Sequence, residues 1–388
     1  MPDIELPTPD RRMVSYRTRA PREWTKANGG ATTRIFFSAA HIVADPLADT
    51  DPWLSAAPDW DATIAYRHYL WSLGLGVAEA MDTAQRGMGL DWPGALELIR
   101  RSVEASRDVP GALMFSGAGT DHLPLSPDLT IADVIRAYEE QIEAIESLGG
   151  RIVLMASRAL VAAARSPEDY AAVYGRILQA VKEPVIIHWL GEMFDPALAG
   201  YWGAPDHNAA MDICLGILAD HAGKVDGIKI SLLDGDKEIA MRRRLPAGVR
   251  MYTGDDFNYP ELIAGDAAGH SDALLGIFDA IAPAASAALA ALGRGSIKEY
   301  HDILAPTVPL SRHIFKAPTR FYKTGIVFLA YLNGHQSHFR MIGGQESARS
   351  LVHLAEIFRL ADQAGVLPDP DLATTRMRGI LQVAGLHS

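Results

Sequence analysis

The chain has 388 residues, of which 48% are hydrophobic and 21% charged, and its formal net charge at pH 7 is −11. These values are typical of a folded, enzyme-sized protein with one large domain or two ordinary ones. The acidic balance and the lack of a concentrated basic segment argue against nucleic acid as a partner. No apolar run approaches the ~20 residues of a membrane span, and no signal-peptide core is present, so we expect no membrane partner and a cytoplasmic location.

Residues 1–33 are predicted to form a solvated N-terminal arm, because their arginines are interleaved with polar and acidic residues. From residue 34 on, short apolar runs alternate with longer amphipathic ones. Several of the short runs are continuously apolar, as parallel strands covered on both faces are. The predicted strands are Arg34–Ala39, Leu75–Ala80, Ala112–Ser116, Arg151–Ala156, Pro184–Trp189, Val225–Ser231, Val249–Gly254 and Ser271–Gly276.

The runs between these strands show helical patterns. The clearest spans Thr130–Leu148, where apolar residues recur at steps of three and four, with glutamates on the other face. Thr130 can cap its start, and Gly149-Gly150 can end it. Pro167 predicts the start of another helix. The alanine-rich run Ala282–Leu292 is predicted to be a closely packed helix.

Strand–helix units over roughly 260 residues match the size of a (β/α)8, or TIM, barrel. We therefore predict an α/β fold with a barrel at residues 34–294 and a C-terminal helical extension at residues 295–388. A doubly wound sheet would show the same alternation and is the alternative. The extension has amphipathic runs at Gln345–Ala364 and Asp371–Val383, with no linker before it. We expect it to pack on the barrel and to help build the subunit contacts of a homo-oligomer.

Barrel enzymes carry their chemistry at the carboxyl ends of the strands. One lysine in such a position, Lys229, lies within the predicted strand Val225–Ser231. Because a strand alternates its faces, Lys229 shares one face with Gly227 and Ser231, while the two isoleucines of the strand share the other. If the isoleucines pack against the outer helices, Lys229 points into the barrel. The other polar residues that we place at strand ends are His41, Asp82, Thr83, His122, Arg158, His188, Asp255, Asp256 and Asp272.

An inward lysine is costly to bury in its charged form, so its pKa tends to fall. The neutral amine is the form that attacks a carbonyl group to make an imine. The alternative for Lys229 is an ordinary lysine that extends out of the strand end or pairs with a carboxylate.

The stretch around Lys229 also resembles the class I aldolases related to dihydrodipicolinate synthase and N-acetylneuraminate lyase. In that family the imine-forming lysine sits in a Gly-Ile-Lys-like sixth strand, and the resemblance spans roughly residues 34–366. It implies that Lys229 forms the imine and that neither a cofactor nor a metal is needed. The other segments that resemble the family, in order, are Pro184-Val185-Ile186-Ile187-His188, Tyr252-Thr253-Gly254-Asp255-Asp256, Gly265-Asp266-Ala267-Ala268-Gly269-His270-Ser271, Phe321-Tyr322-Lys323, Leu332-Asn333-Gly334 and Phe339-Arg340.

Two departures from the family bear on the substrate. The fifth strand normally ends in a tyrosine that relays protons; here His188 stands there, and we expect it to take over, because histidine titrates near neutrality. The second-strand loop normally holds the carboxylate of a 2-keto acid with a Gly-Thr-Thr run, whereas Asp82-Thr83-Ala84-Gln85-Arg86 keeps one hydroxyl. Asp82 would repel an anion, and Asp256 and Asp272 are expected to hold hydroxyl groups. The sequence therefore favours a neutral keto sugar or related polyol over pyruvate, although Arg86 or Arg158 could still bind a carboxylate.

Together these observations predict a class I (Schiff-base) aldolase or lyase that makes or breaks a C–C bond next to the carbonyl of a small polyhydroxylated keto substrate or 2-keto acid. One alternative is a metal-dependent sugar isomerase or lyase; another is an inactive barrel that binds a small effector. The predicted catalytic residues are Lys229 and His188, the predicted substrate-binding residues are Asp82, Thr83, Arg158, Asp256 and Asp272, and the metal alternative would use His41, Glu79, His122 and His188.

Overall fold

The computed structural model describes residues 1–25 and 33–386, and its centre is a closed barrel of parallel strands. Neighbouring strands pair in chain order, and β10 closes the barrel by pairing with β3. The (β/α)8 barrel and all of the predicted strands are thus confirmed, and the doubly wound sheet is not formed. The barrel strands are β3 (Phe36–Ala39), β4 (Gly76–Glu79), β5 (Met114–Ala118), β6 (Ile152–Leu154), β7 (Val185–Leu190), β8 (Val225–Ser231), β9 (Arg250–Thr253) and β10 (Asp272–Leu275).

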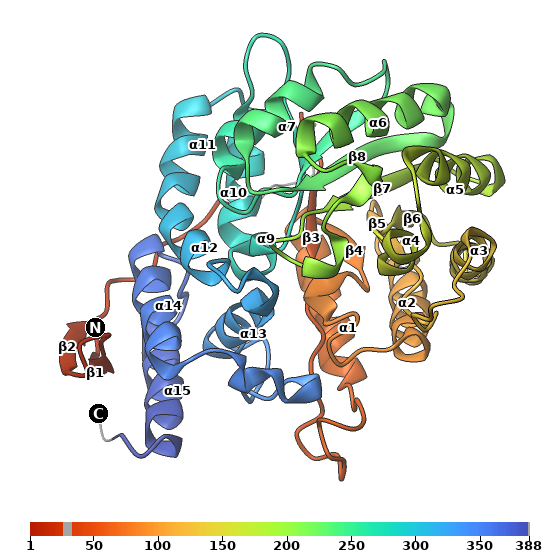
Figure 1. The fold of residues 1–388 in the computed structure, drawn as a ribbon. Helices are drawn as coiled ribbons and strands as arrows, with labels where there is room; N and C mark the ends of the chain where they lie inside the picture. The colour runs from red at the N-terminus through yellow and green to blue at the C-terminus, as the bar shows by residue number, and fades with distance from the viewer. Residues whose placement is uncertain (26–32, 387–388) are drawn as a thin grey trace.

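Helices surround the barrel on its outside (Figure 1). The third of them begins as predicted, because Thr130 and Asp133 exchange the two hydrogen bonds of a capping box. No helix in the described part of the chain is long and apolar enough to cross a membrane. These outer helices are α1 (Trp60–Ser72), α2 (Trp92–Ser106), α3 (Ile131–Ser147), α4 (Arg158–Ala163), α5 (Pro167–Ala180), α6 (His207–Asp220), α7 (Gly235–Arg242), α8 (Tyr259–Ala264), α9 (Ile277–Ala280) and α10 (Ala282–Gly293).

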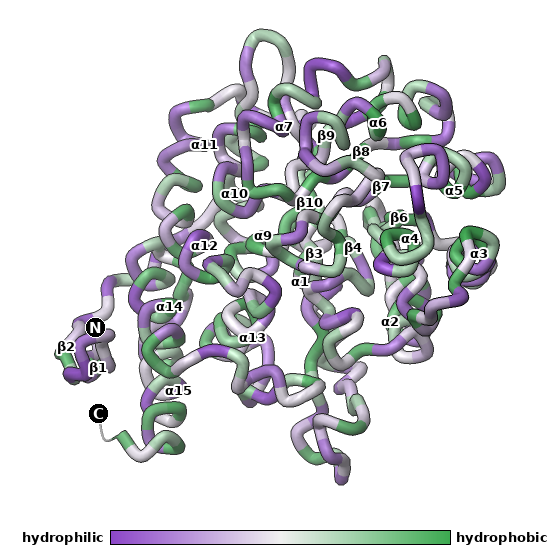
Figure 2. Tube along the Cα trace, viewed as in Figure 1, coloured by the Kyte–Doolittle hydropathy of each residue, from purple (hydrophilic) through white to green (hydrophobic). Residues whose placement is uncertain are grey.

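The barrel wall separates an inner apolar layer from an outer one. The inner layer includes Phe37, Phe115 and Ile186. The outer layer lies between strands and helices and includes Ile228 and Ile230 of β8. The helices accordingly alternate hydrophobic and hydrophilic stretches (Figure 2). Because the two isoleucines face outward, Lys229 faces the barrel interior, as predicted.

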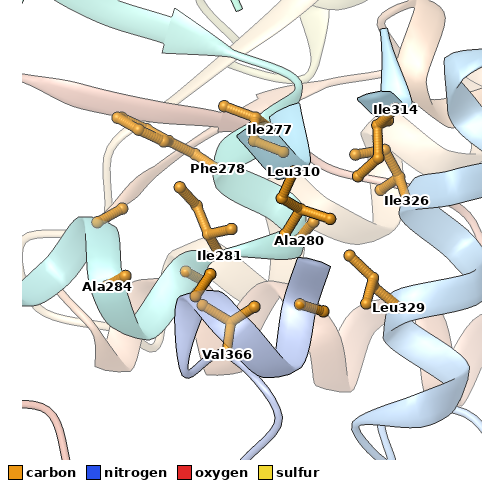
Figure 3. Packing of buried hydrophobic residues seen from close by; sticks show 14 of the residues in the cluster. Ile277, Phe278, Ala280, Ile281, Ala284, Leu310, Ile314, Ile326, Leu329 and Val366 are labelled. Carbon is orange, nitrogen blue, oxygen red and sulfur yellow. The ribbon is translucent and has the colours of Figure 1, made fainter. Parts of the chain in front are cut away.

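The C-terminal helices share one apolar core with the barrel. Ile277 and Phe278 of α9 pack in the same cluster as Leu310, Ile326 and Leu329 of the extension (Figure 3). This packing fixes the start of α13 against the carboxyl end of the barrel, which is the end that carries the chemistry in this fold. The helices of the extension are α11 (Ile297–Leu304), α12 (Val308–Ile314), α13 (Tyr322–Leu332), α14 (Leu351–Ala364) and α15 (Pro370–Val383).

Two segments differ from their predictions. The run Gln345–Ala364 is not one helix, because Arg349 and Ser350 have an extended backbone between a 3-10 turn that ends at Ala348 and the start of α14, which Ser350 caps. The N-terminal arm is not merely solvated: β1 (Asp3–Pro7) and β2 (Met13–Arg17) form an antiparallel hairpin beside α14 (Figure 1). Residues 26–32 of the arm lie outside the described residues.

Candidate active site

A cavity of about 460 Å³ lies at the carboxyl ends of the barrel strands, which we call the mouth. The loops after β4, β5, β6 and β7 form most of its lining, and residues 320–323 at the start of α13 form the rest. The C-terminal extension therefore contributes one wall of the site. The charged and hydrogen-bonding side chains of the lining are Asp82, Arg86, Thr120, Asp121, Arg158, His188, Asp195, Arg320, Tyr322 and Lys323.

Lys229 is buried next to this cavity, with 5% of its surface exposed. It pairs in register with His188 of β7, which lines the cavity, although Lys229 itself is not a lining residue. Among the described residues, no hydrogen bond or ion pair holds its amine. Burial lowers the pKa of Lys229 and outweighs the attraction of Asp82 and Asp256, which would raise it. The amine is therefore easier to deprotonate than that of a free lysine.

Gly254 makes room for this amine. A Cβ atom at residue 254 would lie 2.8 Å from Cε of Lys229, 2.6 Å from the carbonyl oxygen of Ile230 and 2.2 Å from Oγ of Ser231. All three distances are shorter than van der Waals contact. A glycine after β9 is thus a condition for the lysine to occupy its place.

His188 is buried beside Lys229, and its Nε2 lies 3.2 Å from Oγ of Ser231. Burial and the charge of Lys229 lower the pKa of His188 well below its usual range, against the opposing effect of Asp82. The direction of this shift favours the neutral imidazole at pH 7 over the titration near neutrality that the sequence led us to expect. A neutral ring can still pass protons through its hydrogen bonds, so the relay role stays a prediction.

Asp82 and Thr83 lie in a short 3-10 turn, η1 (Asp82–Ala84), that follows β4. The Tyr322 hydroxyl of α13 donates to Asp82 Oδ2 at 2.9 Å and also contacts the Thr83 hydroxyl. Burial would raise the pKa of Asp82, but the amines of Lys323 and Lys229 outweigh it and lower the pKa, so the carboxylate is ionised. No role was predicted for Tyr322; its one sequence signal is the Phe-Tyr-Lys motif of the family resemblance.

Asp256 and Arg158 are both placed at the mouth end of the barrel. Asp256 is buried and accepts a hydrogen bond from the Ile277 N–H at 2.9 Å. Burial raises the pKa of Asp256 to about 8, although this bond and Lys229 lower it, so the group carries a proton near neutral pH. Arg158 lines the cavity and forms an ion pair with Asp195. Counting charges in the sequence would make Asp256 an anion and Arg158 an unpaired cation, but Asp256 is protonated and Arg158 is paired.

Asp272 lies at the opposite end of the barrel, and the prediction that it binds substrate at the mouth is wrong. It is the first residue of β10, and the first residue of a parallel strand lies at the amino end. Its carboxylate accepts hydrogen bonds from the Ile35 N–H at 2.7 Å and from Arg250 at 3.0 Å. Asp272 is thus a structural residue of the barrel base.

The residues of the metal-dependent alternative are not brought together. Both Glu79 oxygens accept hydrogen bonds from Arg67, at 2.8 Å each. Nδ1 of His41 lies 2.9 Å from Asp279, and His122 contacts side chains of α3. Within residues 1–25 and 33–386, no group of three or more His, Cys, Asp or Glu side chains is arranged to hold a metal ion. Arg67 also donates to the carbonyl oxygen of His41, whereas His122 and His188 lie within hydrogen-bond distance of other groups.

Comparisons with known proteins place the chain in one family and one fold. A family model described as "protein of unknown function (DUF993)" matches residues 4–386, and no curated protein matches the chain. A dihydrodipicolinate synthase structure from Thermotoga maritima is 14% identical at a TM-score of 0.62, covering 87% of this chain and 100% of its own. One from Bacillus anthracis is 14% identical at 0.59, covering 90% and 97%. A prophage protein of the dihydrodipicolinic acid synthase family from E. coli K12, solved with pyruvate, is 13% identical at 0.62, covering 92% and 100%. These structures confirm the fold that the resemblance implied.

Proposed function

The chain belongs to the DUF993 family, and we propose that it is a class I aldolase or lyase acting on a small carbonyl substrate. The observation that carries this proposal is Lys229, a buried amine of lowered pKa beside the cavity, with no hydrogen bond or ion pair among the described residues. Burying a lysine costs free energy that packing alone does not return. The barrel shared with dihydrodipicolinate synthase structures, and the resemblance around Lys229, support the same chemistry.

The reaction begins when Nζ of Lys229 attacks the carbonyl carbon and the carbonyl oxygen takes up a proton, which gives a carbinolamine. Loss of water leaves an imine. Once protonated, the imine accepts the electron pair of the Cα–Cβ bond, which breaks as the β-hydroxyl loses its proton and becomes a carbonyl group. The enamine that remains takes up a proton at Cα, and water then releases the product from Lys229; the reverse steps form the bond. Asp256, which holds a proton near neutral pH, and the neutral His188 are the buried groups beside the amine that serve these proton transfers. Asp82, Thr83 and Arg158 are proposed to contact the substrate.

Borohydride trapping tests this proposal on the intact protein. The protein is incubated with pyruvate or with one of a panel of neutral keto sugars, reduced, digested and analysed by mass spectrometry. We expect added mass on the peptide that carries Lys229, because reduction turns the imine into a stable secondary amine. A sample reduced without substrate is the control. Labelling of other lysines only, or no label from any compound, would favour a barrel that binds its ligand without covalent chemistry.

His188→Ala is expected to slow the reaction about 10²–10⁴-fold, the usual contribution of a general acid–base group. The measurement is the initial rate with the compound that labels Lys229 best. Ser231→Ala is the matched control, because it removes the hydroxyl 3.2 Å from Nε2 of His188 and leaves the imidazole in place. A His188→Ala rate within about threefold of the wild-type rate would show that the histidine moves no proton in the slow step.

A further inference from the structure

Lys323 places a second buried amine at the cavity. It lies in the first turn of α13, lines the cavity and is 5% exposed. Its amine donates to the thioether of Met88 at 3.3 Å and to the carbonyl oxygen of Arg320 at 3.4 Å, both weak contacts. In the described part of the chain it forms no ion pair. Burial lowers the pKa of Lys323, against the attraction of Asp82 and Asp195, and no carboxylate of the described residues lies within ion-pair distance of the amine.

Two basic side chains of the cavity lining have no ion pair among the described residues. The lining has four basic side chains and three acidic ones, on a chain whose net charge is −11. Asp121 and Asp195 are each paired with an arginine of the lining. The third acid, Asp82, accepts the Tyr322 hydroxyl. Arg320 and Lys323 form no ion pair among the described residues, although the ionised Asp82 attracts the Lys323 amine from beyond ion-pair distance. The lining basic residues are Arg86, Arg158, Arg320 and Lys323.

The position of Lys323 is rigid. Apolar residues of α13, such as Ile326 and Leu329, are buried in the core that joins the extension to the barrel (Figure 3). The Lys323 amine also lies 5.1 Å from the centre of the Tyr322 ring, whose hydroxyl is tied to the loop after β4. A cation held in place before the ligand arrives loses little conformational entropy on binding. The helix that carries Lys323 is therefore fixed beside the cavity.

We propose that Lys323 binds an oxyanion group of the substrate, a carboxylate or a phosphate, with Arg320 as a second contact at the surface. This inference rests on the proposed function, because the anion is taken to belong to the carbonyl compound that Lys229 attacks. It replaces the expectation of a neutral keto sugar. That expectation relied on negative charge at Asp82, Asp256 and Asp272. Asp256 carries a proton near neutral pH and Asp272 lies at the other end of the barrel, whereas the ionised Asp82 accepts a hydrogen bond from the Tyr322 hydroxyl.

Oxyanions that have no reactive carbonyl test the site apart from any covalent step. Inorganic phosphate and oxalate are titrated by calorimetry into the wild type, Lys323→Met and the control Lys298→Met, whose lysine is exposed on α11. We expect at least one probe to bind the wild type and the control, and Lys323→Met to weaken that binding about tenfold or more. Lys323→Arg should retain it and also shows that residue 323 tolerates substitution. Undiminished binding to Lys323→Met, or no binding of either probe to the wild type, overturns the proposal.

Matched carbonyl pairs then separate this inference from the imine proposal. Pyruvate is compared with pyruvamide, and dihydroxyacetone phosphate with dihydroxyacetone, in borohydride trapping. We expect the anionic member of one pair to label Lys229 at about tenfold lower concentration, and Lys323→Met to remove this preference without changing the neutral member. If nothing labels Lys229 while phosphate or oxalate binds through Lys323, the imine proposal fails and the anion site stands. If neutral and anionic members label the wild type equally, the anion proposal fails and the imine stands.

Discussion

Lys229→Met is expected to abolish the reducible adduct and to lower turnover by about 10⁴–10⁶-fold, the scale of losing a catalytic nucleophile. Lys229→Arg should be equally inactive, because a guanidinium stays protonated and cannot attack a carbonyl. Methionine keeps much of the apolar stem and removes a buried charge, so we expect an unchanged or higher melting temperature. The measurements are the initial rate, the peptide mass after borohydride reduction and the melting curve.

The pH dependence of trapping gives a second check on Lys229. The neutral fraction of the amine rises as pH rises through its pKa, and burial lowers that pKa below its ordinary value. The rate of adduct formation should therefore reach its plateau at lower pH than that of a free lysine, whose pKa is about 10.4. Lys182→Met is the control, because it replaces an exposed lysine that does not line the cavity. Wild-type turnover in Lys229→Met would remove the imine from the mechanism.

The barrel was predictable from the sequence because the strongest signals are local. A parallel strand covered on both faces is apolar along its length, and each of the predicted runs is a strand of the barrel. The orientation of Lys229 also follows from local sequence, since alternation in β8 sends the isoleucines outward and the lysine inward. The face on which a residue of a strand lies can be predicted without knowing the long-range packing of the chain.

The rest of the site depends on contacts between distant parts of the chain. Tyr322 meets Asp82 across 240 residues, and only the packing of α13 on the barrel brings them together. The neutral state of His188 arises from burial and from Lys229 on the neighbouring strand, and no spacing rule reports either effect. The wrong placement of Asp272 has a simpler cause: a residue near a strand boundary belongs to one end of the barrel or the other according to where the strand begins.

Gly254→Ala is expected to lower the rate of adduct formation about 100-fold, the effect of displacing a reacting group by about 1 Å. The added Cβ would lie 2.2 Å from Oγ of Ser231 and 2.8 Å from Cε of Lys229, so both side chains must move. It would also lie 2.6 Å from a backbone oxygen of β8, which cannot rotate away. Such overpacking costs about 1–3 kcal/mol of stability, which a denaturant titration would measure.

Gly216→Ala is the matched control for this change. Residue 216 lies on the exposed side of α6, and a Cβ there meets no atom within 4 Å. Alanine at an exposed helical position stabilises by about 0.4–1 kcal/mol, so this control should keep its activity and melt slightly higher. The rates are compared at a temperature where all three proteins are fully folded, so that lost activity reports the position of Lys229 and not unfolding. If the Gly254→Ala protein forms the adduct at the wild-type rate, the Lys229 amine can react from more than one position. The glycine after β9 would then be needed only for backbone packing.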